Sequence, residues 1–101
     1  MADYSLANKE IKCVPTLYLI TYDDRYYVWE DAMEDFLRGR GLASHMQLFF
    51  AKKTFSDNLS IWWRELHKRH IMRGEEPCRT WNDMKAMLRR RFAPPLSQRK
   101  R

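Results

Sequence analysis

Histidine and cysteine are the residues of this chain that could bind a metal or act as nucleophiles, and the sequence holds three histidines and two cysteines. His67 and His70 are three positions apart, which on a helix places both imidazoles on one side, a spacing that can begin a zinc site. No third or fourth ligand is close in the sequence, and the HExxH motif is missing. Cys78 is more simply interpreted as a packed thiol. We therefore expect no metal and no other cofactor, with His67 exposed and His70 half-buried.

Carboxylates gather in one stretch, where Glu30, Asp31, Glu34 and Asp35 follow each other within six positions. On a helix they lie on the side opposite the apolar residues, so we expect a solvated face without the cleft that raises a catalytic pKa. The sequence also lacks a G-x-S-x-G motif, a P-loop and the D-[ST]-G motif of aspartic proteases. We expect a protein that is not an enzyme and has no small-molecule substrate.

Basic residues dominate the second half of the chain. Residues 1–50 carry five basic and eight acidic side chains, a net charge of −3, whereas residues 51–101 carry fourteen and five, a net charge of +9. The candidates for contact with RNA or DNA phosphates are Arg89, Arg90, Arg91, Arg99, Lys100 and Arg101. The same residues also fit a nuclear-import signal, or the C-terminal end of a helix, where positive side chains interact favourably with the helix dipole.

The element that must position these groups is centred on a pair of tryptophans. Leu59, Trp62, Trp63, Leu66 and His70 recur at steps of three, one, three and four, which predicts an apolar stripe along one helix face. Each tryptophan offers about 150–250 Å² of surface to bury. We expect at least one of the pair to be nearly fully buried and the rest of the fold to cover it.

The predicted fold is all-α, a compact bundle of about four helices with an extended N-terminal segment. A length of 101 residues indicates one domain, and three glycines and four prolines favour long helices over a turn-rich β-sandwich. The predicted helices span 24–38, 44–53, 57–72 and 81–92. The predicted organisation is a flexible N-terminus at 1–10, a helical domain at 11–95 and a basic tail at 96–101.

Helix starts and the core can also be placed from the sequence. The pattern from Thr80 to Asp83 is close to a capping box. Ser56 or Asp57 and, further upstream, Ser44 are the expected caps of two other helices. The predicted core residues are Trp29, Phe36, Trp62, Trp63, Leu66, Trp81, Met84, Leu88 and Phe92.

Cysteine usage and hydropathy indicate the setting. Two cysteines 65 positions apart form neither a CxxC motif nor a disulfide framework, so we expect an intracellular protein, cytoplasmic or nuclear. The apolar runs are far shorter than about 18 residues, and the first ten residues include Asp3, Lys9 and Glu10. We therefore expect neither a membrane span nor a signal peptide.

A set of positions spread over roughly 11–95 carries a family resemblance: Tyr26-x-x-Trp29, Phe36, Phe49, Trp62-Trp63-x-x-Leu66, Thr80-Trp81-x-x-Met84-Lys85 and Leu88-Arg89-x-Arg91-Phe92-x-Pro94. This pattern resembles the Gag domain of gypsy-type LTR retrotransposons, notably those of plants. The resemblance implies a helical capsid lobe that assembles with itself or with other Gag chains around element RNA. It also implies that the matched aromatics are core residues. A live element, a fragment of one and a host protein derived from one all fit.

Two functions follow as hypotheses. The first is a structural, non-enzymatic lobe that self-associates head to tail. In it Glu30, Glu34 and Asp35 of one copy meet Arg89, Arg90 and Arg91 of the next. The alternative is a small nucleic-acid-binding or regulatory adaptor that uses its basic C-terminal half. Salt separates them, because phosphate binding weakens steeply with salt and apolar association does not.

Overall fold

Helices account for most of the chain, as its few glycines and prolines predict. The computed structural model describes residues 4–20 and 23–94, and within these ranges the chain is all-α, with no strand. The elements are α1 (Ser5–Glu10), the short 3₁₀ turn η1 (Ile11–Cys13), α2 (Arg25–Leu37), α3 (Ser44–Lys53), α4 (Asp57–Met72) and α5 (Trp81–Phe92). The four predicted helices are therefore confirmed to within one residue at each end.

The N-terminal region differs from the prediction. The sequence predicts flexibility at 1–10, but Ser5–Glu10 forms α1, so the described part of the chain has five α-helices. Ala7 and Ile11 are buried in the core, and the ring of Tyr4 lies 6.1 Å from that of Phe50. A helix of six residues is too short to be stable alone, so its packing against the body holds it in place.

Residues 14–20 form the predicted extended segment. Leu17 donates its backbone N–H to the carbonyl of Thr54 at 2.8 Å and accepts from the N–H of Ser56 at 2.9 Å. These bonds form an isolated parallel bridge centred on Leu17 and Phe55. The segment thereby ties the entry to α2 to the connection between α3 and α4.

Trp29 of α2 is at the centre of the core. Its indole ring lies 5.7 Å from the ring of Trp81 and 6.1 Å from that of Phe55. Its Nε1 donates to the hydroxyl of Thr54 at 2.7 Å, and this hydroxyl donates to the carbonyl of Ala51 at 2.6 Å. Because every polar atom in this chain of bonds is paired, the indole is buried without an unsatisfied donor.

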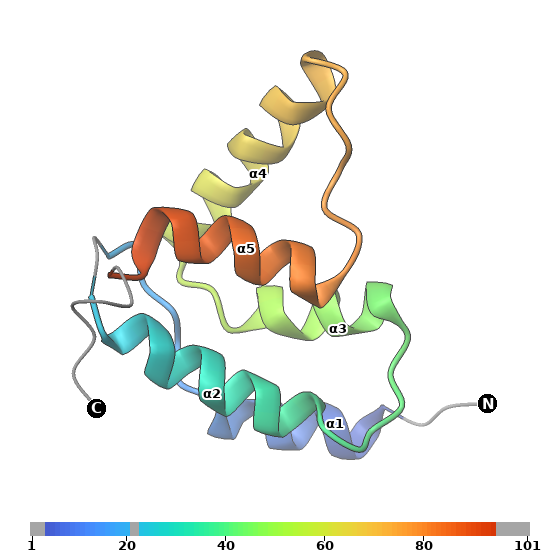
Figure 1. Cartoon of the computed structure of the whole chain (residues 1–101). Helices are drawn as coiled ribbons and strands as arrows, with labels where there is room; N and C mark the ends of the chain where they lie inside the picture. Colours follow the sequence, from blue (N-terminus) through green and yellow to red (C-terminus); the bar gives the residue numbers. More distant parts are fainter. Residues whose placement is uncertain (1–3, 21–22, 95–101) are drawn as a thin grey trace.

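The helices form a body and a projection (Figure 1). Helix α5 packs against α2 and α3, and α4 points away from these three helices before the segment 73–80 returns to α5. Gly74, with a φ of 71°, allows the sharp reversal at the end of α4, since this backbone conformation suits glycine.

Two helix starts agree with the sequence. The hydroxyl of Thr80 accepts from the N–H of Asp83, whose carboxylate accepts from the N–H of Thr80, so α5 has the predicted capping box. Ser56 caps α4 by accepting from the N–H of Leu59. Ser44, however, is wrong as a cap: it is the first residue of α3, and the N-cap is Ala43, which makes no side-chain bond.

Most of the predicted core residues are buried, namely Trp29, Phe36, Trp63, Trp81, Met84, Leu88 and Phe92. Trp63 is the deeper member of the tryptophan pair, 9% exposed, while Trp62 is partly buried against the core. Leu66 is wrong as a core residue, because it is only half-buried. Leu66 belongs to the part of α4 beyond the two tryptophans, where the helix leaves the body. Phe49, which the family resemblance implies to be a core residue, is 46% exposed.

Candidate functional site

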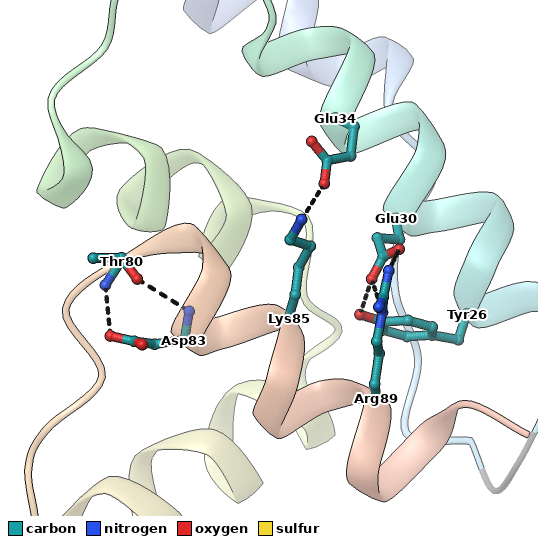
Figure 2. Close-up of polar contacts among 7 residues, drawn as sticks. All are labelled: Tyr26, Glu30, Glu34, Thr80, Asp83, Lys85 and Arg89. Atoms are coloured by element: carbon teal, nitrogen blue, oxygen red, sulfur yellow. Dashed lines mark hydrogen bonds and ion pairs between the residues drawn. The ribbon is translucent and has the colours of Figure 1, made fainter. Parts of the chain in front are cut away.

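A buried carboxylate joins α2 to α5 (Figure 2). The carboxylate of Glu30 accepts three hydrogen bonds. Arg89 donates two of them, from Nε at 2.8 Å and from a terminal NH₂ at 2.6 Å, and the hydroxyl of Tyr26 donates the third at 2.7 Å. The side chain of Glu30 is only 4% exposed. Three donors around one buried carboxylate offset the cost of removing its charge from water. The hydrogen bonds to Glu30 raise the pKa of Arg89, and burial raises the pKa of Tyr26.

A second ion pair lies one helical turn later in α2 and one turn earlier in α5. Nζ of Lys85 lies 2.6 Å from the carboxylate of Glu34 (Figure 2). Burial raises the pKa of Glu34, but the hydrogen bond from Lys85 and the positive charge of that residue outweigh this, and the pKa is lowered overall. Together the two pairs fix the register of α5 on α2.

These pairs correct the predicted contact between chains. The sequence predicts Glu30 and Glu34 on a solvated face, opposite the arginines of a neighbour, but they meet Arg89 and Lys85 of their own chain. Glu30 has Tyr26 four positions before it and Met33 three positions after it, so it belongs to the buried face of α2. The apolar spacing alone could have revealed this. Asp35 remains exposed, with a carboxylate oxygen 3.2 Å from the guanidinium of Arg38, the residue after α2.

Helix α4 is largely uncovered. Of its sixteen residues only Leu59 and Trp63 are buried, while Ile61, Ile71 and Met72 are 55%, 56% and 86% exposed. The helix is held at its beginning, where the Trp62 ring lies 5.0 Å from that of Phe92 and the Trp63 ring lies 6.0 Å from that of Phe55. The second half has apolar side chains on its surface and little of the body against it.

A hollow that we call the cationic groove lies between α3, the beginning of α4 and the returning segment. Its volume is about 360 Å³. It is lined by Leu48, Lys52, Phe55, Ser60, Trp63, Arg64, His67, Cys78 and Met84. This lining includes cationic side chains and no carboxylate. Lys52 and Arg64 take part in no ion pair with any described residue. The groove therefore combines apolar walls with uncompensated positive charge.

A smaller hollow, the α4–α5 groove, lies on another side of α4. It has a volume of about 210 Å³ and is lined by Trp62, Leu66, His70, Met87, Arg90 and Arg91. Arg90 is exposed, and Arg91 lies with its guanidinium 5.2 Å from the centre of the Phe92 ring. Apolar groups and arginines thus flank α4 on both sides.

The predicted nucleic-acid contacts have different surroundings. Arg89 is held by Glu30, whereas Arg90 and Arg91 make no ion pair within the described part of the chain. Arg64 and Arg69 of α4 are likewise without an ion pair there. The tail residues Arg99, Lys100 and Arg101 lie outside the described residues. The cationic surface that joins Lys52 of α3 to Arg64 of α4 could not be predicted from the sequence, because only the tertiary fold assembles it.

The histidines do not converge. His67 lines the cationic groove and is half-buried rather than exposed, while His70 is half-buried, as expected, and lines the α4–α5 groove. Cys78 is a free thiol whose pKa burial raises to about 11, and Cys13 is exposed. No group of three or more histidine, cysteine or acidic side chains suited to a metal ion occurs in residues 4–20 and 23–94.

Comparison with family models, with curated proteins and with solved structures finds no match to this chain, so known proteins give no further guide to this surface. None of the described helices is both long enough and apolar enough to cross a membrane.

Proposed function

We propose that the chain is a structural, non-enzymatic module that associates with further copies of itself, as a Gag-like capsid lobe derived from an LTR retrotransposon. The observation that carries the proposal is the exposure of α4. Ile61, Ile71 and Met72 stand on a helix that buries only Leu59 and Trp63. Exposed apolar side chains grouped on one projecting element are typical of protein interaction sites.

The energetics of α4 favour a partner. Each Å² of apolar surface removed from water stabilises an assembly by about 25 cal/mol. Helices of this length gain most of their stability from packing rather than from propensity. The body packs the beginning of α4, so a partner chain that covers its second half would stabilise the part that the fold leaves exposed.

The Gag-like character of the proposal is supported by the sequence pattern alone. The tryptophan pair, the Thr80-Trp81-x-x-Met84-Lys85 start and the Arg91-Phe92-x-Pro94 end are its main elements. In this proposal the partners are other copies of the chain or other Gag chains. Two free thiols fit an intracellular setting, cytoplasmic or nuclear.

Sedimentation velocity tests the proposal. The purified chain, followed from micromolar to millimolar concentration at low and high salt, should gain mass with concentration and keep that gain at high salt. The double variant Ile71→Asp with Met72→Asp should stay monomeric, because it places charges on the exposed end of α4. Leu6→Asp is the matched control, since Leu6 is exposed on α1. A chain that stays monomeric at millimolar concentration at both salt levels would contradict the proposal.

A second function, nucleic-acid binding, is favoured by the arginines without ion pairs. Arg64, Arg69, Arg90 and Arg91 are free of carboxylate partners within the described residues, which leaves their charge available to phosphates. A labelled single-stranded RNA should bind with an affinity that falls with salt, and removing one cation that binds a phosphate should reduce the logarithmic slope by about 0.7. Arg90→Ala should reduce the slope. Arg38→Ala should not, because Arg38 is paired with Asp35.

A further inference from the structure

One exposed stripe of α2 combines carboxylates with an apolar side chain. Asp24, Val28, Asp31 and Asp35 are all exposed and follow each other at steps of four, three and four, which aligns them along one side of the helix. Val28 is 62% exposed. From end to end the stripe spans about 17 Å of helix. We call it the acidic stripe.

The acidic stripe faces away from α5. Glu30 and Glu34, which bind α5, lie more than about 100° around the helix from Val28. The ion pairs that fix α2 to α5 therefore leave the stripe on the outside of the molecule. Its four side chains are exposed in the folded chain, with Asp35 beside Arg38.

The cationic groove has complementary properties. Lys52, Arg64 and His67 stand around apolar walls that include Trp63 and Phe55, and its lining contains no carboxylate. An occupant that matches this chemistry carries an apolar side chain flanked by negative charges. In the described part of this chain, Val28 between Asp24 and Asp31 is a segment of that kind.

We propose that the acidic stripe of one copy docks into the cationic groove of the next, with Val28 against Trp63 and Phe55. This inference rests on the proposed self-association and adds a contact between two further surfaces to that of the exposed second half of α4. The surfaces are different, so the contact is heterologous, and each added copy leaves one of each free. Such contacts produce rings or filaments rather than closed dimers. The charges set orientation and encounter rate, and the apolar contact supplies most of the affinity.

The chain offers a direct chemical test, because Cys78 lines the cationic groove. Cys13→Ser removes the other thiol, and Val28→Cys places one on the acidic stripe. Mild oxidation of this double variant should produce a ladder of dimers, trimers and longer species. Mass spectrometry of the digest should find disulfides that join position 28 to Cys78. A further Cys78→Ser substitution should reduce the ladder to dimers at most.

Two companion variants make each outcome decisive. Burial raises the pKa of Cys78 to about 11, which slows its oxidation, so Ser60→Cys with Cys78→Ser presents a second thiol in the groove. Leu6→Cys in place of Val28→Cys is the matched control, exposed on α1 and outside the stripe, and should not form the ladder. Disulfides only between two positions 28, or a ladder equally strong with Leu6→Cys, would overturn the docking of the stripe.

Sedimentation of the Cys13→Ser chain separates the two proposals. If this chain associates but neither groove thiol joins position 28, the head-to-tail contact is wrong and self-association stands. If the Cys13→Ser chain is monomeric at millimolar concentration, self-association is wrong, and the head-to-tail contact is wrong as well. An additional arm at high salt should slow formation of the ladder, since the charges steer the encounter.

Discussion

Helices α4 and α5 are consecutive in the chain and both amphipathic, yet the fold uses them differently. Helix α5 buries Trp81, Met84, Leu88 and Phe92 among its twelve residues and is tied to α2 by two ion pairs. Helix α4 has sixteen residues and buries only two side chains. The apolar content of a helix therefore does not determine how much of it its own chain covers. What α4 leaves exposed is surface for a partner.

Two leucine truncations test this contrast most strongly. Leu88→Ala in α5 removes a fully buried side chain and should lower the free energy of unfolding by about 2–5 kcal/mol. Leu66→Ala in α4 removes the same atoms from a half-buried site, and at micromolar concentration should cost about 1 kcal/mol or less. Urea denaturation measures both. Equal losses would mean that α4 is packed as firmly as α5.

The ion pair to Glu30 should be the next largest effect. Arg89→Ala leaves the buried carboxylate with the hydroxyl of Tyr26 as its remaining donor, and should cost about 1.5–3 kcal/mol. Arg90→Ala, its neighbour without an ion pair, should stay within about 0.5 kcal/mol of the native chain. Thermal unfolding of the two variants checks this. If Arg90→Ala is the more damaging, the pairing described for Glu30 is not the one that holds α5.

The caps of the two helices offer a matched comparison. Thr80→Ala and Ser56→Ala each remove a side chain that accepts from a backbone N–H, and each should cost about 0.5–2 kcal/mol. Thr80→Ser keeps the hydroxyl and should be nearly silent. Equal losses from Thr80→Ala and Thr80→Ser in chemical denaturation would show that the methyl group of Thr80 matters rather than its cap.

Acid should weaken the attachment of α5 by a smaller amount. The lowered pKa of Glu34 means that its contribution to stability is present above the ordinary value of 4.5 and is lost as the pH falls through the folded value. Glu34→Gln should therefore reduce the loss of stability between neutral and acidic pH. Asp35→Asn, which alters a carboxylate paired only at the surface, is the control. Parallel pH curves for the native chain and Glu34→Gln would contradict the role of the Lys85 pair.

Local signals in the sequence predicted the four longer helices and the cap of α5. Spacing, glycines and the capping pattern at 80–83 are properties of neighbouring residues, and the structure follows them closely. The burial of Glu30 was also present in the spacing, since its helical neighbours Tyr26 and Met33 are core residues. The charge of Glu30 favours an exposed position, so its charge and its spacing predict opposite environments.

Features that depend on tertiary packing could not be predicted. Helix α1 is short and polar, and its stability comes from the body beneath Ala7 and Ile11. The cationic groove joins Lys52 of α3, Arg64 of α4 and Cys78, which become neighbours only after folding. The partial exposure of Leu66 likewise depends on the direction in which α4 leaves the body, and no periodicity encodes that direction.

Amide hydrogen exchange at several protein concentrations tests the central claim, that α4 is an element completed by another copy. At micromolar concentration the amides of residues 66–72 in α4 should exchange much faster than those of residues 84–88 in α5. As the concentration rises to millimolar, the α4 segment should become protected while the α5 segment does not change. Protection of both segments to the same degree at low concentration, or fast exchange of the α4 segment at every concentration, would contradict it.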